Sequence, residues 1–356
     1  MHKLSSHVTF VILNLIDGTY NYSKKILQYK QEVKKYEENK VWRRIFMVIK
    51  VNNLVKRYGD LVALDHLSFD VREGEIFGLL GPNGSGKTTA INCILSLLSY
   101  DKGEIEVFGK PMTPESYEAK RNIGVVMQNV AVFNELTVRE NVDYFCGLYV
   151  PDKKEKKRLV DEAIAFVGLE KYEKFVPKKL SGGLLRRLNI ACGIAHKPKI
   201  IILDEPTVAV DPQSRNKILE GIKELNKKGA TVIYTSHYME EVEQICSRIM
   251  ILDHGKSIAS GSKESLKAMI DVGEKISIEL YDLEEEHVQS FRKLPNVASV
   301  SYDENLLTIH SYKAANNLEH VLEHIKTRNM AFGKIYSEKP TLNDVFLELT
   351  GKELRD

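Results

Sequence analysis

Residues 81–89 read GPNGSGKTT, and this stretch decides the fold. It lies between an apolar run, EIFGLL (75–80), and a stretch of helical composition, TTAINCILSLL (88–98). Glycines let backbone N–H groups turn inward to form an anion-binding nest, and the positive end of a following helix points at the same place. We therefore predict a phosphate-binding loop between a strand and a helix.

The loop fits the pattern Gly-x-x-x-x-Gly-Lys-Ser/Thr from Gly81 to Thr88. We predict that Lys87 reaches the β- and γ-phosphates of a nucleotide and that the Thr88 hydroxyl ligates Mg²⁺. The alternative is a glycine turn with a surface lysine, which the flanking strand and helix disfavour. The predicted nucleotide contacts of the loop are Gly81, Pro82, Asn83, Gly84, Ser85, Gly86, Lys87, Thr88 and Thr89.

Composition narrows the class of protein. Of the 356 residues, 43% are hydrophobic and 28% are charged, which is typical of a globular protein with a core. The net charge of +2 gives no support to nucleic acid as a partner. The four cysteines are scattered, so we predict a cytosolic chain with neither a zinc site nor disulfides. No apolar run approaches the roughly 20 residues of a membrane helix, so service to a membrane would need a partner.

Residues 1–46 differ from the rest of the chain. They hold one apolar patch, VTFVILNLI (8–16), and then a stretch rich in Lys, Glu and Tyr. From Met47, the sequence MVIKVNNLVKRYGD starts with a strand-like segment. Our hypothesis is that translation starts at Met47 and that residues 1–46 are a leader created by a misplaced gene start. The alternative is an amphipathic segment that contacts a membrane or a partner.

Residues 47–270 alternate strand-like and helix-like patterns, which predicts one α/β domain. The apolar runs EIFGLLG (75–81), KIIILDEP (199–206) and ATVIYTSH (230–237) predict strands covered on both faces, as in a parallel sheet. Helices between them would form the crossover connections. The segment RIMILDHGKSIASG predicts a hairpin that turns at Asp253–Gly255.

Residues 271–356 predict a small, separate α+β domain. KISIEL (275–280) alternates apolar and polar residues, and VASVSYDENLLTIHSY (297–312) predicts two strands around a turn. In NNLEHVLEHIKTRN (316–329), the apolar residues fall on one helical stripe. A ferredoxin-like arrangement would join these elements. A helix-like segment, TLNDVFLELTG (341–351), follows them.

Two further segments carry candidate chemistry. The apolar run IIILDEP (200–206) ends in two carboxylates. We predict that Asp204 holds Mg²⁺ through water and that Glu205 deprotonates a water that attacks the γ-phosphate. Alone, such a pair would be a solvated strand end. In KKLSGGLLRRLNIA (178–191), Ser-Gly-Gly precedes an amphipathic helix, where a hydroxyl and bare amides bind anions.

These motifs, in this order, make residues 47 to about 262 resemble the ATP-binding subunits of ATP-binding-cassette (ABC) transporters. The resemblance implies an α/β P-loop cassette with a mixed-sheet core and a helical subdomain, with ATP and Mg²⁺ as cofactors. It also implies a homodimer, or a pair with a second cassette, in which the signature of one copy covers the γ-phosphate held by the other. The signature residues here are Leu180, Ser181, Gly182 and Gly183.

Four single residues match functional positions of that family. Tyr58, in VKRYGD, matches the aromatic residue that stacks on adenine, and Gln128, in VVMQN, matches the glutamine that senses Mg²⁺ and the attacking water. His237, in TSHYMEEVE, matches the switch histidine that contacts the γ-phosphate, and Asp211, in VAVDP, matches the aspartate that links the two sites. Alone, each would be an ordinary structural residue. The implied catalytic residues are Lys87, Glu205 and His237.

The sequence departs from the family pattern at two places. Leu184 stands where the signature usually has glutamine, and Val208–Val210 reads Val-Ala-Val where Ser-Gly-Leu is usual. The second change would weaken communication between the two sites. Neither change removes a phosphate ligand or the candidate base, so we expect an active ATPase.

The end of the chain narrows the subfamily, because LNDVFLELTG (342–351) resembles the ATPases of ABC-2-type exporters. The implied function is ATP hydrolysis that powers export through a separate integral-membrane permease, at the cytoplasmic face of the membrane. The residues do not specify the cargo. Phe133, Tyr144 and Phe145 would line the groove that receives a helix of the permease, or would be core residues instead.

Other functions are compatible with parts of the sequence. A soluble ABC ATPase that acts on ribosomes or DNA is the main alternative, although the single cassette and the lack of long coiled coils or zinc insertions argue against it. A kinase could use the same phosphate loop, but it would not need LSGG before the carboxylate pair. The basic run KKEKKR (153–158) predicts a solvated helix face, since Glu155 interrupts it.

Overall fold

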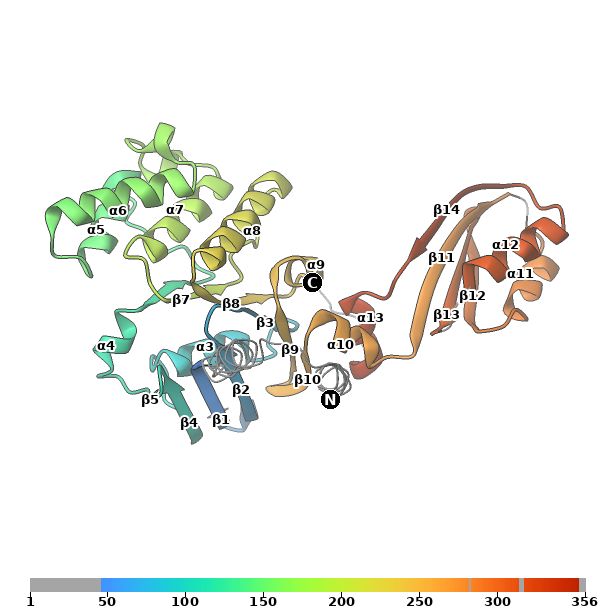
Figure 1. Cartoon of the computed structure of the whole chain (residues 1–356), viewed down its shortest axis with the longest axis horizontal. Helices are drawn as coiled ribbons and strands as arrows, with labels where there is room; N and C mark the ends of the chain where they lie inside the picture. The colour runs from blue at the N-terminus through green and yellow to red at the C-terminus, as the bar shows by residue number, and fades with distance from the viewer. Residues whose placement is uncertain (1–45, 282, 314–316, 352–356) are drawn as a thin grey trace, which may run out of the picture. The chain divides into compact units, whose positions relative to one another are not determined.

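The computed structural model of the chain describes residues 46–281, 283–313 and 317–351. The hypothesis of a leader before Met47 and its amphipathic alternative concern residues that lie outside the described ones. The described residues form an α/β part and, later in the chain, a smaller α+β part (Figure 1). Within them, no helix is both long enough and apolar enough to cross a membrane.

The centre of the α/β part is a six-stranded sheet of order β10-β9-β3-β8-β7-β6. Neighbouring strands are parallel from β9 to β6, and the edge pair β9–β10 is antiparallel. Every residue of β3, β7 and β8 is buried. The predicted parallel sheet and its hairpin are therefore confirmed. The strands are β3 (Ile76–Leu80), β6 (Ile123–Val126), β7 (Ile200–Asp204), β8 (Thr231–Ser236), β9 (Arg248–Asp253) and β10 (Lys256–Gly261).

A four-stranded antiparallel sheet, of order β2-β1-β4-β5, packs with helix α3 (Lys87–Ile94) on one face of the parallel sheet. Ile49 and Leu67 of this sheet share a core cluster with Phe77 of β3 and Ile91 of α3. Together the two sheets form the mixed-sheet core that the family resemblance implies. The strands are β1 (Met47–Tyr58), β2 (Leu61–Arg72), β4 (Lys102–Val107) and β5 (Lys110–Pro111).

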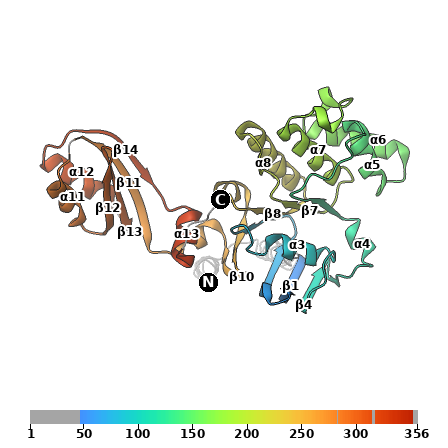
Figure 2. The same ribbon diagram turned by 180° about the vertical axis from the view of Figure 1, so that it is seen from behind.

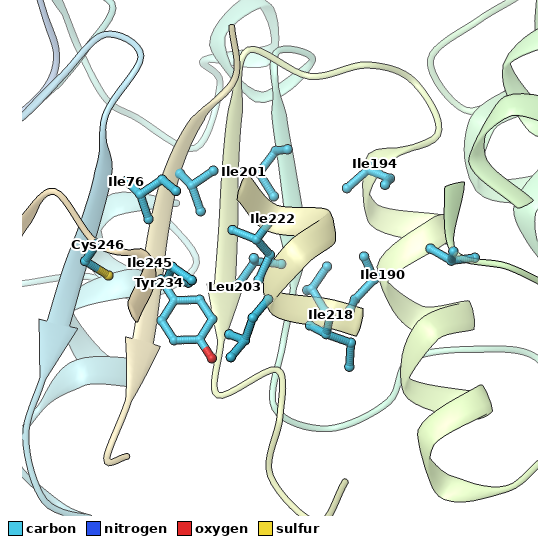
Figure 3. Close-up of a cluster of buried hydrophobic side chains, with 14 of the residues drawn as sticks. Ile76, Ile190, Ile194, Ile201, Leu203, Ile218, Ile222, Tyr234, Ile245 and Cys246 are labelled. Atoms are coloured by element: carbon cyan, nitrogen blue, oxygen red, sulfur yellow. The ribbon is translucent and has the colours of Figure 1, made fainter. Parts of the chain in front are cut away.

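Helices cover the opposite face of the parallel sheet. Figure 3 shows Ile201 and Leu203 of β7 in one cluster with Ile190 of α7 and with Ile218 and Ile222 of α8. Burial of each such side chain stabilises the fold by about 1.5–3 kcal/mol, so this cluster fixes both helices on the sheet. The helices of the α/β part are α4 (Tyr117–Lys120), α5 (Val138–Gly147), α6 (Lys153–Phe166), α7 (Gly182–Ile194), α8 (Pro212–Lys227), α9 (Met239–Ile245) and α10 (Lys263–Ala268), with the 3₁₀ turns η1 (Glu170–Tyr172) and η2 (Pro177–Lys179).

Helices α5, α6 and α7 contact one another and form the implied helical subdomain. The basic run 153–158 opens α6, with Lys153, Lys154 and Lys157 exposed. Within this run, Lys156 pairs with Asp143 at 2.6 Å. The predicted solvated helix face is therefore confirmed.

The α+β part follows the order βαββαβ. Its antiparallel sheet has the order β12-β13-β11-β14, and its two helices bury Phe291, Val321 and Ile325 in a separate core. This is the ferredoxin-like arrangement that the alternation of residues predicts. The elements are β11 (Val272–Leu280), α11 (Glu285–Arg292), β12 (Val297–Asp303), β13 (Leu306–Tyr312), α12 (Asn317–Thr327) and β14 (Phe332–Glu338).

The last described helix, α13 (Leu342–Thr350), packs on the α/β part of the chain. Leu342, Val345 and Phe346 are buried in the cluster that also holds the side chains of α7, α8 and α9. Helix α13 contacts α9 and α10, and Figure 1 shows α10 beside it; Figure 2 gives the view from behind. The chain therefore leaves the cassette at β11 and returns to it after β14.

Candidate functional site

The phosphate loop connects β3 to α3, as the sequence predicts. Gly86 caps α3 with a φ of 108°, and a Cβ atom there would lie 2.7 Å from the Ala63 carbonyl oxygen, so only glycine fits. The Lys87 side chain is 4% exposed, and its Nζ donates to the carbonyl oxygens of Gly81 at 2.8 Å and Pro82 at 3.1 Å. The loop therefore folds back over its own lysine.

Asp204 is the last residue of β7 and is fully buried. Its Oδ2 accepts a hydrogen bond from the Thr88 Oγ1 at 2.9 Å, and its Oδ1 accepts one from the Thr235 Oγ1 at 2.6 Å. Thr235 lies beside it because β7 and β8 are parallel neighbours. Of the three residues predicted to hold Mg²⁺, Thr88 and Asp204 are thus in direct contact, and Gln128 contacts Glu205.

Glu205 follows the strand in a left-handed conformation, with a φ of 48°. For a residue with a large side chain, that conformation costs about 1–3 kcal/mol. Its N–H donates to the Thr235 backbone oxygen at 3.2 Å and to the Thr235 Oγ1 at 3.0 Å, and these bonds hold the strained backbone. Strain that surrounding contacts maintain in this way is typical of functional sites.

Three of the predicted site residues contact the Glu205 carboxylate. Its Oε1 lies 3.2 Å from the Lys87 Nζ and 3.3 Å from the His237 Nδ1, and its Oε2 accepts from the Gln128 Nε2 at 3.1 Å. Both Lys87 and Glu205 are about 5% exposed. The structure therefore brings the predicted base, lysine, glutamine and histidine into one cluster at the tips of β7 and β8.

A cavity of about 530 Å³ opens beside this cluster, which is large enough for a small-molecule ligand. Tyr58 stands at its side, 49% exposed, with the Lys56 Nζ 5.1 Å from its ring centroid. The lining residues are Tyr58, Leu61, Val62, Ala63, Asn83, Gly84, Gly86, Lys87, Thr88, Thr89, Gln128, Glu205 and His254.

The signature residues lie elsewhere in the same chain, and they are not among the described residues that line this cavity. Ser181 caps α7 by accepting from the Leu184 N–H at 3.4 Å. A Cβ on Gly183 would meet the Ser214 Oγ at 2.5 Å, so the signature turn packs against the start of α8. Ser181 and Gly182 are exposed.

Asp211 caps α8 beside the signature turn. Its Oδ1 accepts from the Ser214 N–H at 2.9 Å, and hydrogen bonds from Ser214 lower the pKa of the Asp211 carboxyl. Of the two departures from the family pattern, Leu184 packs half-buried against the core. The other departure, at residues 208–210, includes Ala209, which has a φ of 58°, a conformation that favours glycine.

Two residues of the site were missed in the sequence. Thr235 contacts both carboxylate residues, and its position two residues before His237 on β8 was the available signal. Arg186, on α7, is 5% exposed and donates to the Met127 backbone oxygen at 3.1 Å, next to Gln128. Burial lowers the pKa of the Arg186 guanidinium.

Comparisons with known proteins address the family of the chain. The family described as "ABC transporter" matches residues 64–208. The chain is 40% identical to the linearmycin resistance ATP-binding protein LnrL of Bacillus subtilis, with 87% of this chain and 100% of that protein covered. It is 33% identical to the Nod factor export ATP-binding protein I of Sinorhizobium fredii, with 87% and 88% covered.

Solved structures show the same fold. A dimeric ATP-binding cassette in a post-hydrolysis state, bound to ADP and Pi, aligns with a TM-score of 0.56 and 28% identity, covering 60% of this chain and 98% of that one. The cbiO1 subunit of Clostridium perfringens aligns with a TM-score of 0.58 and 26% identity, covering 70% and 96%.

The relatives therefore decide between the functions that the sequence left open. A kinase and a soluble ATPase that acts on ribosomes or DNA are set aside, because these two relatives, which match most of this chain, are named ATP-binding proteins of linearmycin resistance and of Nod factor export. The chain belongs to the ABC transporter family, and it is an ATP-binding and ATP-hydrolysing subunit of the exporter type.

Proposed function

We propose that two copies of this chain bind ATP head to tail, hydrolyse it with Glu205 as the general base, and drive export through a separate integral-membrane permease. The observation that carries the proposal is the Glu205 carboxylate, which is buried and strained and is surrounded by Lys87, Gln128 and His237. A carboxylate at this place can take a proton from the water that attacks the γ-phosphorus, while ADP leaves.

The other residues would divide the remaining work. Lys87 supplies positive charge for the β- and γ-phosphates, and loop N–H groups supply further donors. His237 contacts the γ-phosphate, and Gln128 orients the water. Both side chains already contact the Glu205 carboxylate, which supports these roles. Tyr58 stacks on adenine, since its ring is half-exposed beside the cavity.

The residues present fit Mg²⁺. The Thr88 hydroxyl and the Asp204 carboxylate lie 2.9 Å apart, and oxygen atoms of this kind are the ligands that Mg²⁺ prefers. Gln128 uses its amide nitrogen on Glu205, which leaves its amide oxygen for the ion. Mg²⁺ usually has few protein ligands and shares substrate phosphates, where it neutralises developing charge.

The second copy would complete the site. Ser181 and Gly182 are exposed at the positive end of α7, where backbone amides can bind an anion. They do not line the cavity of their own chain. A head-to-tail partner would place this turn over the γ-phosphate, with the Asp211 loops between the two sites.

An aromatic surface on the helical subdomain would receive the permease. Phe133 and Tyr144 are 43% and 47% exposed, and their ring centroids are 4.9 Å apart. Phe145 stacks on Phe133 at 5.8 Å and packs partly against the core. Exposed aromatic residues that gather in this way mark a protein interface. The subunit would then be a peripheral protein at the cytoplasmic face of the membrane, without a nucleic acid partner.

Glu205→Gln tests the proposal, because glutamine keeps the shape of the side chain and removes the base. We expect hydrolysis to fall by about 10²- to 10⁴-fold while ATP binding is retained, and we expect ATP to trap a dimer in size-exclusion chromatography. Glu220→Gln, at an exposed position of α8, is the matched control. Unchanged hydrolysis by Glu205→Gln would remove Glu205 from its role.

A further inference from the structure

A second buried carboxylate, Glu241, lies behind the site. It belongs to α9 and is 3% exposed. Its Oε2 accepts hydrogen bonds from three hydroxyl groups, at 2.7 Å from Thr207, 2.6 Å from Tyr234 and 3.1 Å from Ser236. Its Oε1 lies 3.2 Å from the Arg215 Nε. Neither the sequence motifs nor the proposed mechanism gives this residue a role.

One oxygen atom of Glu241, Oε2, is an acceptor shared by three hydroxyl groups. Because all three hydroxyl groups donate to it, the Oε2 atom acts only as an acceptor in this arrangement. Burial and the Glu241 charge raise the pKa of the Tyr234 hydroxyl well above its usual value, so Tyr234 remains a donor. A buried charge of this kind is costly unless it is paired and hydrogen-bonded, and Arg215 supplies the opposite charge.

The partners of Glu241 come from the segments that surround the active site. Thr207 lies two residues after Glu205, and Ser236 lies directly before His237. Arg215 is on α8, and its backbone N–H donates to the Asp211 carbonyl oxygen at the start of that helix. Glu241 therefore contacts three segments: the one that follows Glu205, the one that precedes His237, and helix α8.

We propose that Glu241 is a positioning residue for ATP hydrolysis, which fixes His237 and the loop after Glu205 relative to α8. The proposal rests on the proposed roles of Glu205 and His237. The Ser236 Oγ donates to Glu241 and accepts from the Tyr238 N–H at 2.9 Å, so the backbone on both sides of His237 is held.

Arg215 and Tyr238 form a second link to the histidine. The Tyr238 ring centroid is 4.1 Å from that of His237 and 4.9 Å from the Arg215 guanidinium carbon. In the described part of the chain, neither the Arg215 Nε nor the Glu241 Oε1 makes a hydrogen bond of good geometry, so charge alone holds this pair. A shift of α8 on contact with a partner cassette would thus reach His237 through Arg215, Glu241 and Tyr238.

The test is Glu241→Gln in the full chain, with hydrolysis measured against ATP concentration in the presence of Mg²⁺. Outer residues that hold catalytic groups typically matter by about 10- to 100-fold, so we expect kcat to fall by that factor while KM and ATP affinity stay unchanged. Glu240→Gln, at the exposed neighbouring position of α9, is the matched control and should hydrolyse ATP normally.

A double-mutant cycle with His237→Ala separates positioning from simple stabilisation. If Glu241 acts through His237, Glu241→Gln should lower the residual rate of His237→Ala far less than it lowers that of the wild type. Equal effects in both backgrounds, or a wild-type kcat in Glu241→Gln, would overturn the proposal. Normal hydrolysis by Glu205→Gln would instead overturn the proposed base.

A second variant covers the case in which Glu241→Gln does not fold. Arg215→Gln removes the charge pair but leaves the three hydroxyl bonds to Glu241, and Arg215 is already about one-third exposed. We expect a smaller loss of kcat, again with an unchanged ATP affinity. A folded Arg215→Gln protein with wild-type kcat would show that α8 does not act on the site through this contact, and this outcome also overturns the proposal.

Discussion

The phosphate half and the signature half of the cassette are built in opposite ways. In the phosphate half, which comprises residues 81–89 with Asp204 and Glu205, Lys87 and the two carboxylates are buried, and contacts already join Lys87 to Glu205 and Thr88 to Asp204. In the signature half, which comprises residues 180–183 with Asp211, the exposed Ser181 and Asp211 side chains cap their own helices. The contacts of one half are made within the chain, whereas the other presents an exposed helix N-terminus, which the proposed function assigns to the second copy.

This difference explains why an isolated subunit would bind ATP better than it hydrolyses it. If the proposed function holds, buried and fixed contacts would let the phosphate half bind ATP without help, and the signature half would gain partners only when a second chain approaches. Because ATP would contact both halves only in the closed pair, the ligand itself would shift the population toward the dimer.

Mixing two inactive variants tests whether the phosphate half of one chain works with the signature half of another, and it has the largest expected effect. Lys87→Ala destroys the phosphate half. Gly182→Asp places a negative charge in the signature half, and its Cβ would have only the Ala209 carbonyl oxygen nearby, at 3.8 Å, so the chain still folds. We expect each variant alone to lose activity by about 10²-fold or more, measured as phosphate release.

An equal mixture of the two variants should regain activity. Half of the pairs formed at random are mixed, and each mixed pair has one site with an intact loop and an intact signature, so up to about a quarter of the sites work. Gly182→Asp alone should still bind ATP as the wild type does, because its phosphate half is intact. A mixture as inactive as its components would show that the two halves do not meet across a pair.

Tyr58→Ala should have a smaller effect, confined to the phosphate half. Stacking of a base on an aromatic ring contributes about 1–3 kcal/mol, so the KM for ATP should rise roughly tenfold while kcat stays constant. Tyr58→Phe is the control and should keep the wild-type KM, since the ring remains. A change in kcat, or an equal loss in Tyr58→Phe, would contradict the stacking role.

Much of the cassette could be predicted because its central strands are buried on both faces. Continuous apolar runs at 75–81, 199–206 and 230–237 have no solvent-facing alternation, and this pattern leads directly to β3, β7 and β8. The antiparallel β1–β2 pair was less visible, because register shifts interrupt its alternation. The position of α13 could not be predicted, since its apolar stripe does not say which surface will cover it.

In the site, too, some residues could be predicted from the sequence and others could not. Residues within one motif, such as Lys87 and Thr88, could be named because the spacing along the chain sets their geometry. Thr235 and Glu241 could not, since their contacts depend on how β7, β8 and α9 align in space. The Val-Ala-Val departure becomes clear only in the structure, where Ala209 adopts a φ of 58° that costs a non-glycine residue on the order of 1 kcal/mol.

Asp211, in the signature half, should have the smallest effect, because it is exposed and caps only its own helix. Asp211→Ala removes the cap and should lower the thermal unfolding midpoint slightly at neutral pH. Asp211→Asn keeps a cap and removes the charge, so it isolates the charge contribution. Hydrogen bonds from Ser214 lower the pKa of the folded-state carboxyl below 3.8, so the wild type gains stability from the charge above that pH.

That gain must disappear as the pH falls through the folded-state pKa, because the carboxyl is then protonated in both states. The difference in unfolding midpoint between wild type and Asp211→Asn should therefore be constant from neutral pH to about pH 5 and should narrow below 3.8. A difference that grows on acidification would show that the charge is unfavourable in the folded chain. An Asp211→Ala curve equal to the wild type at every pH would show that this half of the cassette needs no cap at α8.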